Sequence, residues 1–315
     1  MTAKSKLIWN GVLVIFLGLL MFGIYEAAER VDYTWRWERL PKYIFYTDSQ
    51  VTKAPVDGVV EVKGNTVTIT PSGRDADPVT LNGVDGITVK NGDTVTSGSQ
   101  IAVKNTTKAG PLVVGLLTTL YISFFSIIFA IILGIMTGLA RISKNPFFKK
   151  LAVIYIEIIR GTPLLVQIFI FYFFIGTVLN LDRITAGVAA LSVFTGAYIA
   201  EIVRAGIQSI SRGQMEAARS LGMSYTQAMI LVILPQAFKR TLPPMAGQFI
   251  SLIKDSSLVS VISITDLTKA GREVVASTFS PFEVWFTVAA LYLIMTSALS
   301  FLVQRLEKKM AQQDR

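Results

Sequence analysis

The chain has 315 residues, of which 52% are hydrophobic and 16% charged, and its mean hydropathy is +0.54. This composition excludes an ordinary soluble domain and is typical of proteins that cross a membrane several times. The absence of cysteine and histidine excludes disulfides, common zinc sites and Ser-His-Asp triads, and the net charge of +9 is too scattered for a nucleic-acid partner.

The N-terminal region predicts a membrane helix followed by an interfacial segment. Residues 7–25 are almost wholly apolar and approach the length of about 20 residues that a span needs. No small-residue cleavage site follows them, so we interpret residues 1–28 as an uncleaved helix and not as a signal peptide. Residues 29–46 mix Trp and Tyr with charges, which favours an amphipathic segment at the lipid headgroups; an aromatic linker is the alternative.

Residues 47–109 differ from the rest of the chain and predict a small all-β insert. Runs such as GVVEV and TVTIT alternate Val or Ile with polar residues, and Asn-Gly, Ser-Gly and Asp-Gly pairs separate them. Residues 54–60 and 87–102 resemble the barrel-sandwich hybrid fold of lipoyl and biotinyl domains. A carrier domain of that kind needs a lysine at the tip of a hairpin, and residues 71–78 contain none. We therefore expect no cofactor, and an interaction or shielding role.

Five further apolar stretches bring the expected number of membrane helices to about six: residues 112–139, 151–179, 184–203, 242–264 and 282–303. Basic residues gather after the second and fourth of the six stretches and in the tail: Arg141, Lys144, Lys149, Lys150, Arg204, Arg212, Arg219, Lys239, Arg240, Arg305, Lys308, Lys309 and Arg315. Because short cytoplasmic loops collect Lys and Arg, both termini are predicted to be cytoplasmic and the insert external.

Residues 213–236 predict two helices joined by a glycine turn. A first helix over 215–221 is expected to stop at Gly222, and Ser224 is a natural N-cap for a second helix over 225–234, which Pro235 then interrupts. On the first helix, a face of small residues comprises Ala217, Ala218 and Leu221, beside the single charge of Glu216. This pattern suits a helix that docks into a groove on a partner, with a plain cytoplasmic loop as the alternative.

The same stretch resembles a known signature. Glu216-Ala217-Ala218, then Gly222, then Leu234-Pro235 is similar to the EAA motif of membrane permease subunits in binding-protein-dependent ABC importers. Further blocks resemble the polar amino acid branch of that family: residues 157–167, 196–206, 234–237 and 254–258. The resemblance covers about residues 111–305.

The resemblance implies a type I ABC importer fold, with a permease core over 110–315 and a coupling loop over 205–236. In that fold the motif residues Glu216, Ala217, Ala218, Gly222, Leu234 and Pro235 couple the permease to the ATPase. The implied partners are a cytoplasmic ABC ATPase dimer, an external substrate-binding protein, a second permease copy or paralogue and a polar amino acid, at a bacterial cytoplasmic membrane. The sequence has no phosphate-binding loop of its own, so the chain is expected to be a transport subunit and not an enzyme.

Ionisable residues within apolar stretches indicate functional sites, because burying a charge in a bilayer is costly. We interpret Lys254, Asp255, Ser256 and Ser257 as lining the translocation path; a buried ion pair with Glu157 or Arg160 is the alternative. Glu157 and Arg160 can share a helical face ahead of a kink at Gly161-Thr162-Pro163. For Glu157, Arg160 and Thr162, gating, structural use and solute contact all stay open.

Tyr198, Glu201 and Arg204, near the end of the 184–203 stretch, are expected to be structural. Two other classes of function stay open from the residues alone. An ion-coupled secondary transporter or channel would use Lys254 and Asp255 for coupling or selectivity, and a membrane-anchored envelope protein would act through the β insert.

Overall fold

The computed structural model describes residues 3–30, 32–72 and 77–312, which divide into two units, Met1–Leu40 and Pro41–Arg315. The first unit consists of helix α1 (Ala3–Glu29) and the short helix η1 (Trp37–Arg39). Within α1, Trp9–Ala27 is long and apolar enough to cross a membrane, and none of it is buried. Ahead of η1, the rings of Trp35 and Trp37 stack with centroids 5.8 Å apart. The unit thus offers an exposed apolar helix followed by an aromatic segment.

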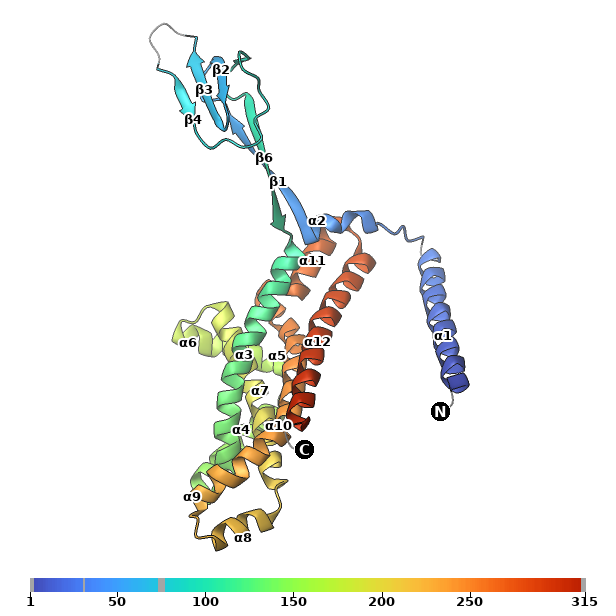
Figure 1. The fold of residues 1–315 in the computed structure, drawn as a ribbon, viewed down its shortest axis with the longest axis vertical. Helices are drawn as coiled ribbons and strands as arrows, with labels where there is room; N and C mark the ends of the chain where they lie inside the picture. Colours follow the sequence, from blue (N-terminus) through green and yellow to red (C-terminus); the bar gives the residue numbers. More distant parts are fainter. Residues whose placement is uncertain (1–2, 31, 73–76, 313–315) are drawn as a thin grey trace. The chain divides into compact units, whose positions relative to one another are not determined.

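The β region of the second unit contains two sheets. Strands β1 (Phe45–Lys53) and β6 (Gln100–Ala109) form a long antiparallel ribbon, in which Phe45 pairs with Ala109 and the register shifts near Lys53 (Figure 1). The other four strands form an antiparallel sheet in the order β4-β3-β2-β5: β2 (Gly58–Lys63), β3 (Thr66–Pro71), β4 (Val79–Leu81) and β5 (Thr94–Val95). The predicted β insert is therefore present, and the barrel-sandwich resemblance stays a prediction.

The β region has a core of its own. Along β3, Val67 and Ile69 are fully buried while their neighbours are more exposed, as the alternation of the sequence predicts. They pack with Val60 and Ile101 in one hydrophobic cluster. Residues 73–76, within the stretch examined for a carrier lysine, lie outside the described residues.

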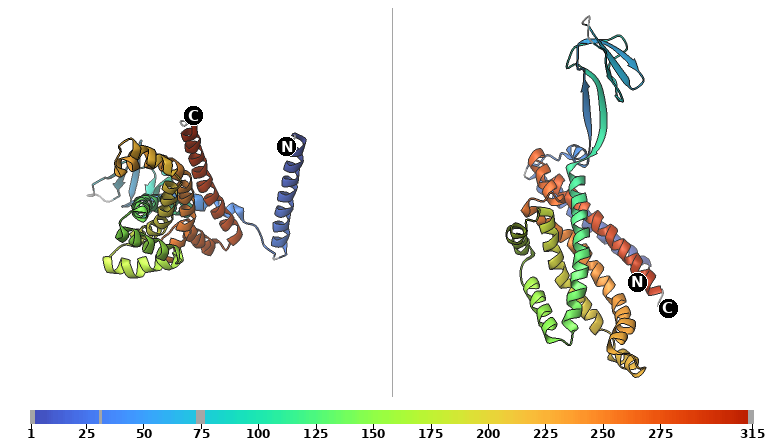
Figure 2. Two further views of the ribbon diagram at one scale, coloured as in Figure 1. Left: turned by 90° about the horizontal axis from the view of Figure 1, so that it is seen from below. Right: turned by 90° about the vertical axis from the view of Figure 1, so that its left-hand side faces the viewer.

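Helices make up the remainder of the second unit (Figure 2). Three of its elements are not α-helical: η2 and η3 are π-helical and η4 is a 3₁₀ helix. In chain order the elements are α2 (Pro41–Ile44), α3 (Pro111–Ile142), α4 (Pro146–Arg160), α5 (Leu164–Phe169), η2 (Ile170–Gly176), α6 (Thr177–Leu179), α7 (Arg183–Gln208), α8 (Arg212–Ser220), α9 (Tyr225–Ala228), η3 (Met229–Ile233), α10 (Leu234–Asp255), η4 (Ser256–Ile262), α11 (Leu267–Thr278) and α12 (Pro281–Gln312).

Helices α3 and α7 pack closely because α3 carries glycine where α7 approaches. A Cβ added to Gly134 would lie 2.5 Å from the Cγ2 of Ile199, and one added to Gly138 would lie 2.8 Å from the carbonyl oxygen of Ala200. The two glycines are four residues apart and therefore share one face of α3. Small residues at this spacing are a common means of close helix packing in membranes, where lipid supplies no hydrophobic drive for association.

The membrane helices differ from the expected six in their number and in the bounds of one span. Among the described residues, four helices are long and apolar enough to span a membrane, or five if the bent pair α4 and α5–α6 forms one span. The expected span over 242–264 needs correction: α10 begins earlier, at Leu234, ends at Asp255 and gives way to η4. Its four charged residues lower the mean hydropathy of the helix. They are Lys239, Arg240, Lys254 and Asp255.

Candidate functional site

The segment from α8 to α9 forms the predicted helix, glycine turn and helix. The hydroxyl of Ser211 caps α8 by accepting a hydrogen bond from the amide of Gly213 at 3.3 Å. At the other end, Gly222 has a φ of +85°, and the amide of Met223 donates to the carbonyl of Ala218 at 3.2 Å. A residue in the left-handed region with this hydrogen bond is a Schellman stop, for which glycine is favoured. The helix therefore ends where the sequence predicts.

The second helix begins with a capping box. The hydroxyl of Ser224 accepts from the amide of Gln227 at 3.2 Å, and the side chain of Gln227 accepts from the amide of Ser224 at 2.8 Å. The predicted interruption at Pro235 is wrong. The helix continues through the π-helical segment η3 into α10, and Pro235 lies directly after η3, where the hydrogen-bond pattern changes from π-helical to α-helical.

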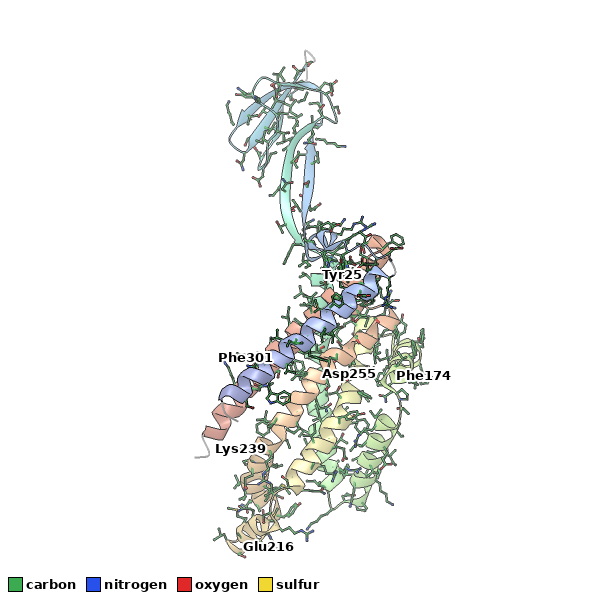
Figure 3. The ribbon with its side chains drawn as sticks, turned by 90° about the vertical axis from the view of Figure 1, so that its right-hand side faces the viewer. Tyr25, Phe174, Glu216, Lys239, Asp255 and Phe301 are labelled. Carbon is green, nitrogen blue, oxygen red and sulfur yellow. The ribbon has the colours of Figure 1, made fainter. Side chains whose placement is uncertain are left out.

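The exposed face of α8 differs from the predicted one. Glu216 and Ala217 are exposed, and Leu221, just after the helix, is 81% exposed. Ala218 is buried and so cannot belong to the same docking face. A carboxylate, a small residue and an apolar side chain are thus presented at one end of the helical part, where Figure 3 labels Glu216. Leu234 is half-buried and Pro235 is exposed, and both lie at the start of α10 rather than on α8.

Several contacts attach this segment to the membrane helices. The guanidinium of Arg240, on α10, donates at 2.7 Å to the carbonyl of Ser209, which caps the end of α7 three residues before α8 begins. The ammonium of Lys144 lies 4.9 Å from the ring centroid of Tyr225. Met215, on the inner side of α8, packs against the main hydrophobic cluster. A displacement of α8 would therefore act on α10 and on the connection between α3 and α4.

A cluster of charges joins three helices near this segment. Glu201 of α7 receives Arg141 of α3 at 2.9 Å, Arg204 of α7 at 2.7 Å and Arg160 of α4 at 3.9 Å. The Arg160 guanidinium also lies 5.2 Å from the ring centroid of Tyr198. The sequence indicated Tyr198, Glu201 and Arg204 as structural but missed Arg141, whose only signal was its place at the end of an apolar stretch.

The break after α4 is sharper than a kink. The axes of α4 and the following helical segment differ by 104° at Gly161-Thr162-Pro163. The side-chain amide of Gln167 stabilises the break by donating to the carbonyl of Ile159 at 2.7 Å and to the hydroxyl of Thr162 at 2.8 Å. The predicted bend is confirmed, and Thr162 contributes through the polar contacts of the turn itself.

The other predicted site residues lie apart from one another. Glu157 is exposed and makes no ion pair within the described part of the chain, whereas Arg160 turns toward Glu201. Lys254 is exposed and Asp255 half-buried where α10 becomes η4, well away from Glu216 (Figure 3). The alternative of an ion pair between Lys254 or Asp255 and Glu157 or Arg160 is therefore not observed.

The serines beside Lys254 differ in accessibility. Ser256 is buried, and its hydroxyl donates to the carbonyl of Ile253 at 2.8 Å. Ser257 is half-buried. Of the four residues assigned to a translocation path, Lys254, Asp255 and Ser257 are thus accessible, while Ser256 serves the local backbone. No group of acidic residues that could hold a metal ion occurs within residues 3–30, 32–72 and 77–312.

Comparison with known proteins agrees with this arrangement. The family described as the binding-protein-dependent transport system inner membrane component matches residues 130–312. The chain belongs to this permease family. As a member, it is a multi-pass membrane component of a transport system and is not itself the ATPase. The resemblance inferred from the 213–236 stretch and its neighbouring blocks is thereby confirmed at the level of the family.

Individual permeases show how far the similarity extends. The chain is 41% identical over 202 residues to the glutamine transport system permease protein GlnP of Escherichia coli, covering 63% of this chain and 92% of that one. It is 40% identical over 198 residues to the L-cystine transport system permease protein TcyB of Bacillus subtilis, covering 62% and 85%. The β region lies outside the stretch that the family matches.

Solved structures give the same result for the permease fold. A crystal structure of an amino acid ABC transporter with histidines has a chain that is 40% identical to this one, with a TM-score of 0.60 over 63% of this chain and 94% of that chain. The MetNI methionine ABC transporter, in an inward-facing conformation, shares the fold at 20% identity, with a TM-score of 0.55 over 63% and 95%.

Proposed function

We propose that this chain is the permease subunit of an ATP-driven importer for a polar amino acid. Its similarity to the glutamine and cystine permeases supports this substrate class. The observation that carries the mechanism is the α8 segment, which exposes Glu216, Ala217 and Leu221 and follows Ser209, to which Arg240 of α10 is hydrogen-bonded. The partners are a cytoplasmic ABC ATPase dimer, an external substrate-binding protein and a second permease copy or paralogue.

In this mechanism α8 docks into a groove on the ATPase and carries no chemistry of its own. The Schellman stop ends α8 at a fixed residue, and the capping box fixes where α9 begins. Because the connection between the two helices is ordered, a movement of the ATPase is transmitted to the membrane helices. Gly222 acts as the turn, and Leu234 and Pro235 continue the lever into α10. Ala218 acts from the inside, by packing α8 against its own chain.

The translocation path runs past the junction of α10 and η4. Lys254 is exposed there and makes no ion pair within the described part of the chain, so its charge is available to a polar solute or a partner permease. Asp255 and Ser257 line the same region. We assign Glu157, Arg160 and Thr162 to a gate at the 104° break, because Thr162 is held within the bend by Gln167 while Arg160 links it to Glu201 of α7.

The orientation follows from the basic residues around α8 and the α3–α4 connection, which favour the cytoplasmic side. Both termini are then cytoplasmic and the β insert external, where it contacts the binding protein or the cell envelope. Because the chain contains no cysteine, single-cysteine variants test this directly. Ser72→Cys in the insert is expected to react in intact cells with a membrane-impermeant maleimide, and Ser220→Cys on α8 only after permeabilisation; the reverse pattern contradicts the orientation.

Reconstitution tests the function itself. Proteoliposomes holding the permease, its ATPase and its binding protein are expected to take up a labelled polar amino acid when ATP is supplied inside. An ATPase variant without hydrolysis is the control and is expected to abolish uptake. Uptake that persists with that variant and follows an imposed ion gradient would contradict the proposal and favour the ion-coupled transporter.

A further inference from the structure

A cavity of about 780 Å³ lies where the ends of α3, α4 and α7 meet α8, α9 and η3. Four basic side chains line it: Arg141, Lys149, Arg204 and Arg212. Its lining residues include no carboxylate. The coupling role proposed above uses the exposed outer face of α8, whereas this cavity lies behind α8 and makes no part of that docking surface.

The charges around the cavity do not balance. Arg141 and Arg204 share the single carboxylate of Glu201, which also receives Arg160. Lys149 and Arg212 are exposed and form no ion pair within the described residues. The Nη1 atom of Arg141 is buried and has no hydrogen-bond partner among those residues. The Oε1 atom of Glu201, which Arg141 contacts, is likewise buried without a hydrogen bond to any described residue, so this pair does not by itself indicate a missing acceptor. The excess of four basic side chains over one neighbouring carboxylate is what favours an anion with several acceptor oxygens.

Most of the other lining residues are apolar, beside the polar side chains of Gln208, Ser211 and Tyr225, and they bear on the kind of anion. Basic and apolar side chains line the same space, including Ile142, Val153, Ile207 and Met229. A cationic pocket with apolar walls at the end of membrane helices suits a phosphate that carries an acyl chain, because the headgroup meets the guanidinium groups while the chain stays out of water. A small hydrophilic anion would leave these walls without a partner.

We propose that this cavity binds a phosphate group, which its apolar walls assign to the headgroup of an anionic phospholipid. A bound phosphate contacts α3, α4, α7 and α8 at once, and so stabilises the packing of α8 against the other three helices. The site itself does not depend on the proposed transport function; only its place in the cytoplasmic leaflet, which we infer from the proposed orientation, rests on that proposal.

Native mass spectrometry of the full-length chain in detergent tests the site, with phosphatidylglycerol titrated against phosphatidylcholine. The double variant Lys149→Gln/Arg212→Gln is expected to lower phosphatidylglycerol affinity about 25-fold, at about fivefold per removed charge. These residues are chosen because neither forms an ion pair with Glu201, so the cluster beneath remains intact. Lys150→Gln, at a neighbouring exposed position outside the cavity, is the matched control and is expected to bind as the unaltered chain does.

A parallel titration with inorganic phosphate, at ionic strength matched with sodium chloride, identifies the source of the phosphate. If phosphate binds alone and is lost in the double variant, while phosphatidylglycerol binds no better than phosphatidylcholine, the site takes free phosphate and the lipid assignment is overturned. If neither ligand distinguishes the double variant from Lys150→Gln, the proposal itself is overturned. Because no ATPase or amino acid is present, either outcome is independent of the transport function.

Discussion

The Nε atom of Arg141 lies 2.9 Å from the Oε1 atom of Glu201, and this contact ties the end of α3 to α7 across 60 residues of sequence. Arg204 and Arg160 approach the second oxygen of the same carboxylate. The side chain of Glu201 is only 17% exposed, so water can do little to stabilise its charge if the arginine contacts are lost. One carboxylate therefore holds three cations of α3, α4 and α7.

Replacing Glu201 by Gln is expected to destabilise the permease by about 2 kcal/mol, because three guanidinium groups lose their shared counter-charge. Removing one partner of a fully buried pair costs about 3–5 kcal/mol, and the partial exposure of these arginines reduces that figure. Thermal unfolding of the purified chain measures the effect. Glu157→Gln is the control, since Glu157 is exposed and makes no ion pair in the described part of the chain; equal melting temperatures for both variants would contradict the prediction.

Gly138→Ala is expected to destabilise the contact between α3 and α7 by about 1–3 kcal/mol. Its Cβ would lie 2.8 Å from the carbonyl oxygen of Ala200, so one of the two helices must shift. Gly247→Ala in α10 is the matched control, because nothing lies within 4 Å of its added Cβ. In the purified chain the control is expected to be neutral or to gain up to about 1 kcal/mol from helix propensity. Similar losses in both variants would show that close packing is not the cause.

Lys108 in the insert is expected to react slowly with acylating reagents. Its hydrogen bond to Asp48, at 2.5 Å across the β1–β6 ribbon, raises the pKa of the ammonium above its usual value. Because the pKa of Lys108 is higher in the folded protein than in the unfolded chain, its bond to Asp48 stabilises the fold fully at a pH below the unfolded pKa. That stabilisation is lost as the pH rises through the folded pKa. Competitive acylation of the whole protein at pH 8 to 11 measures the reactivity of Lys108. Asp48→Asn should accelerate the labelling of Lys108 alone.

Lys254→Met is expected to lower ATP-driven uptake about tenfold with unchanged yield of the permease–ATPase complex, if the ammonium at the end of α10 faces the solute. Lys254→Arg keeps the positive charge and should retain more uptake. The comparison separates a path residue from a structural one. Parallel loss of complex and uptake in the Met variant would assign Lys254 to assembly instead.

The helix, glycine turn and helix from α8 to α9 were predictable because their determinants are local. Gly222 and Ser224 end and begin helices through hydrogen bonds to residues within five positions, so the sequence carries the whole signal. The direction of Ala218 was not predictable in the same way. Ala218 is buried where α8 packs on its own chain, η3 among its neighbours, and the sequence of α8 alone does not reveal those neighbours.

Elements that depend on distant partners were predicted less well. In the sequence, Arg141 indicates only that the apolar stretch ends on the cytoplasmic side. Its ion pair with Glu201 becomes visible only in the structure, where α7 lies beside α3. The span over 242–264 fails for a different reason: α10 begins before it and carries four charged residues, and the helix tightens into η4 just after Asp255. Hydropathy averages over such a change of helix type and does not detect it.

The most direct test of the coupling role is Glu216→Lys, measured by recovery of the ATPase with the purified permease and by ATP-driven uptake. Glu61→Lys in the insert makes the same charge change at another exposed carboxylate and is the control. We predict that the Glu216 variant folds and inserts normally while complex recovery and uptake both fall at least tenfold, and that the Glu61 variant retains both. Normal recovery and uptake in Glu216→Lys would contradict the assignment of α8 as the helix that couples this permease to its ATPase.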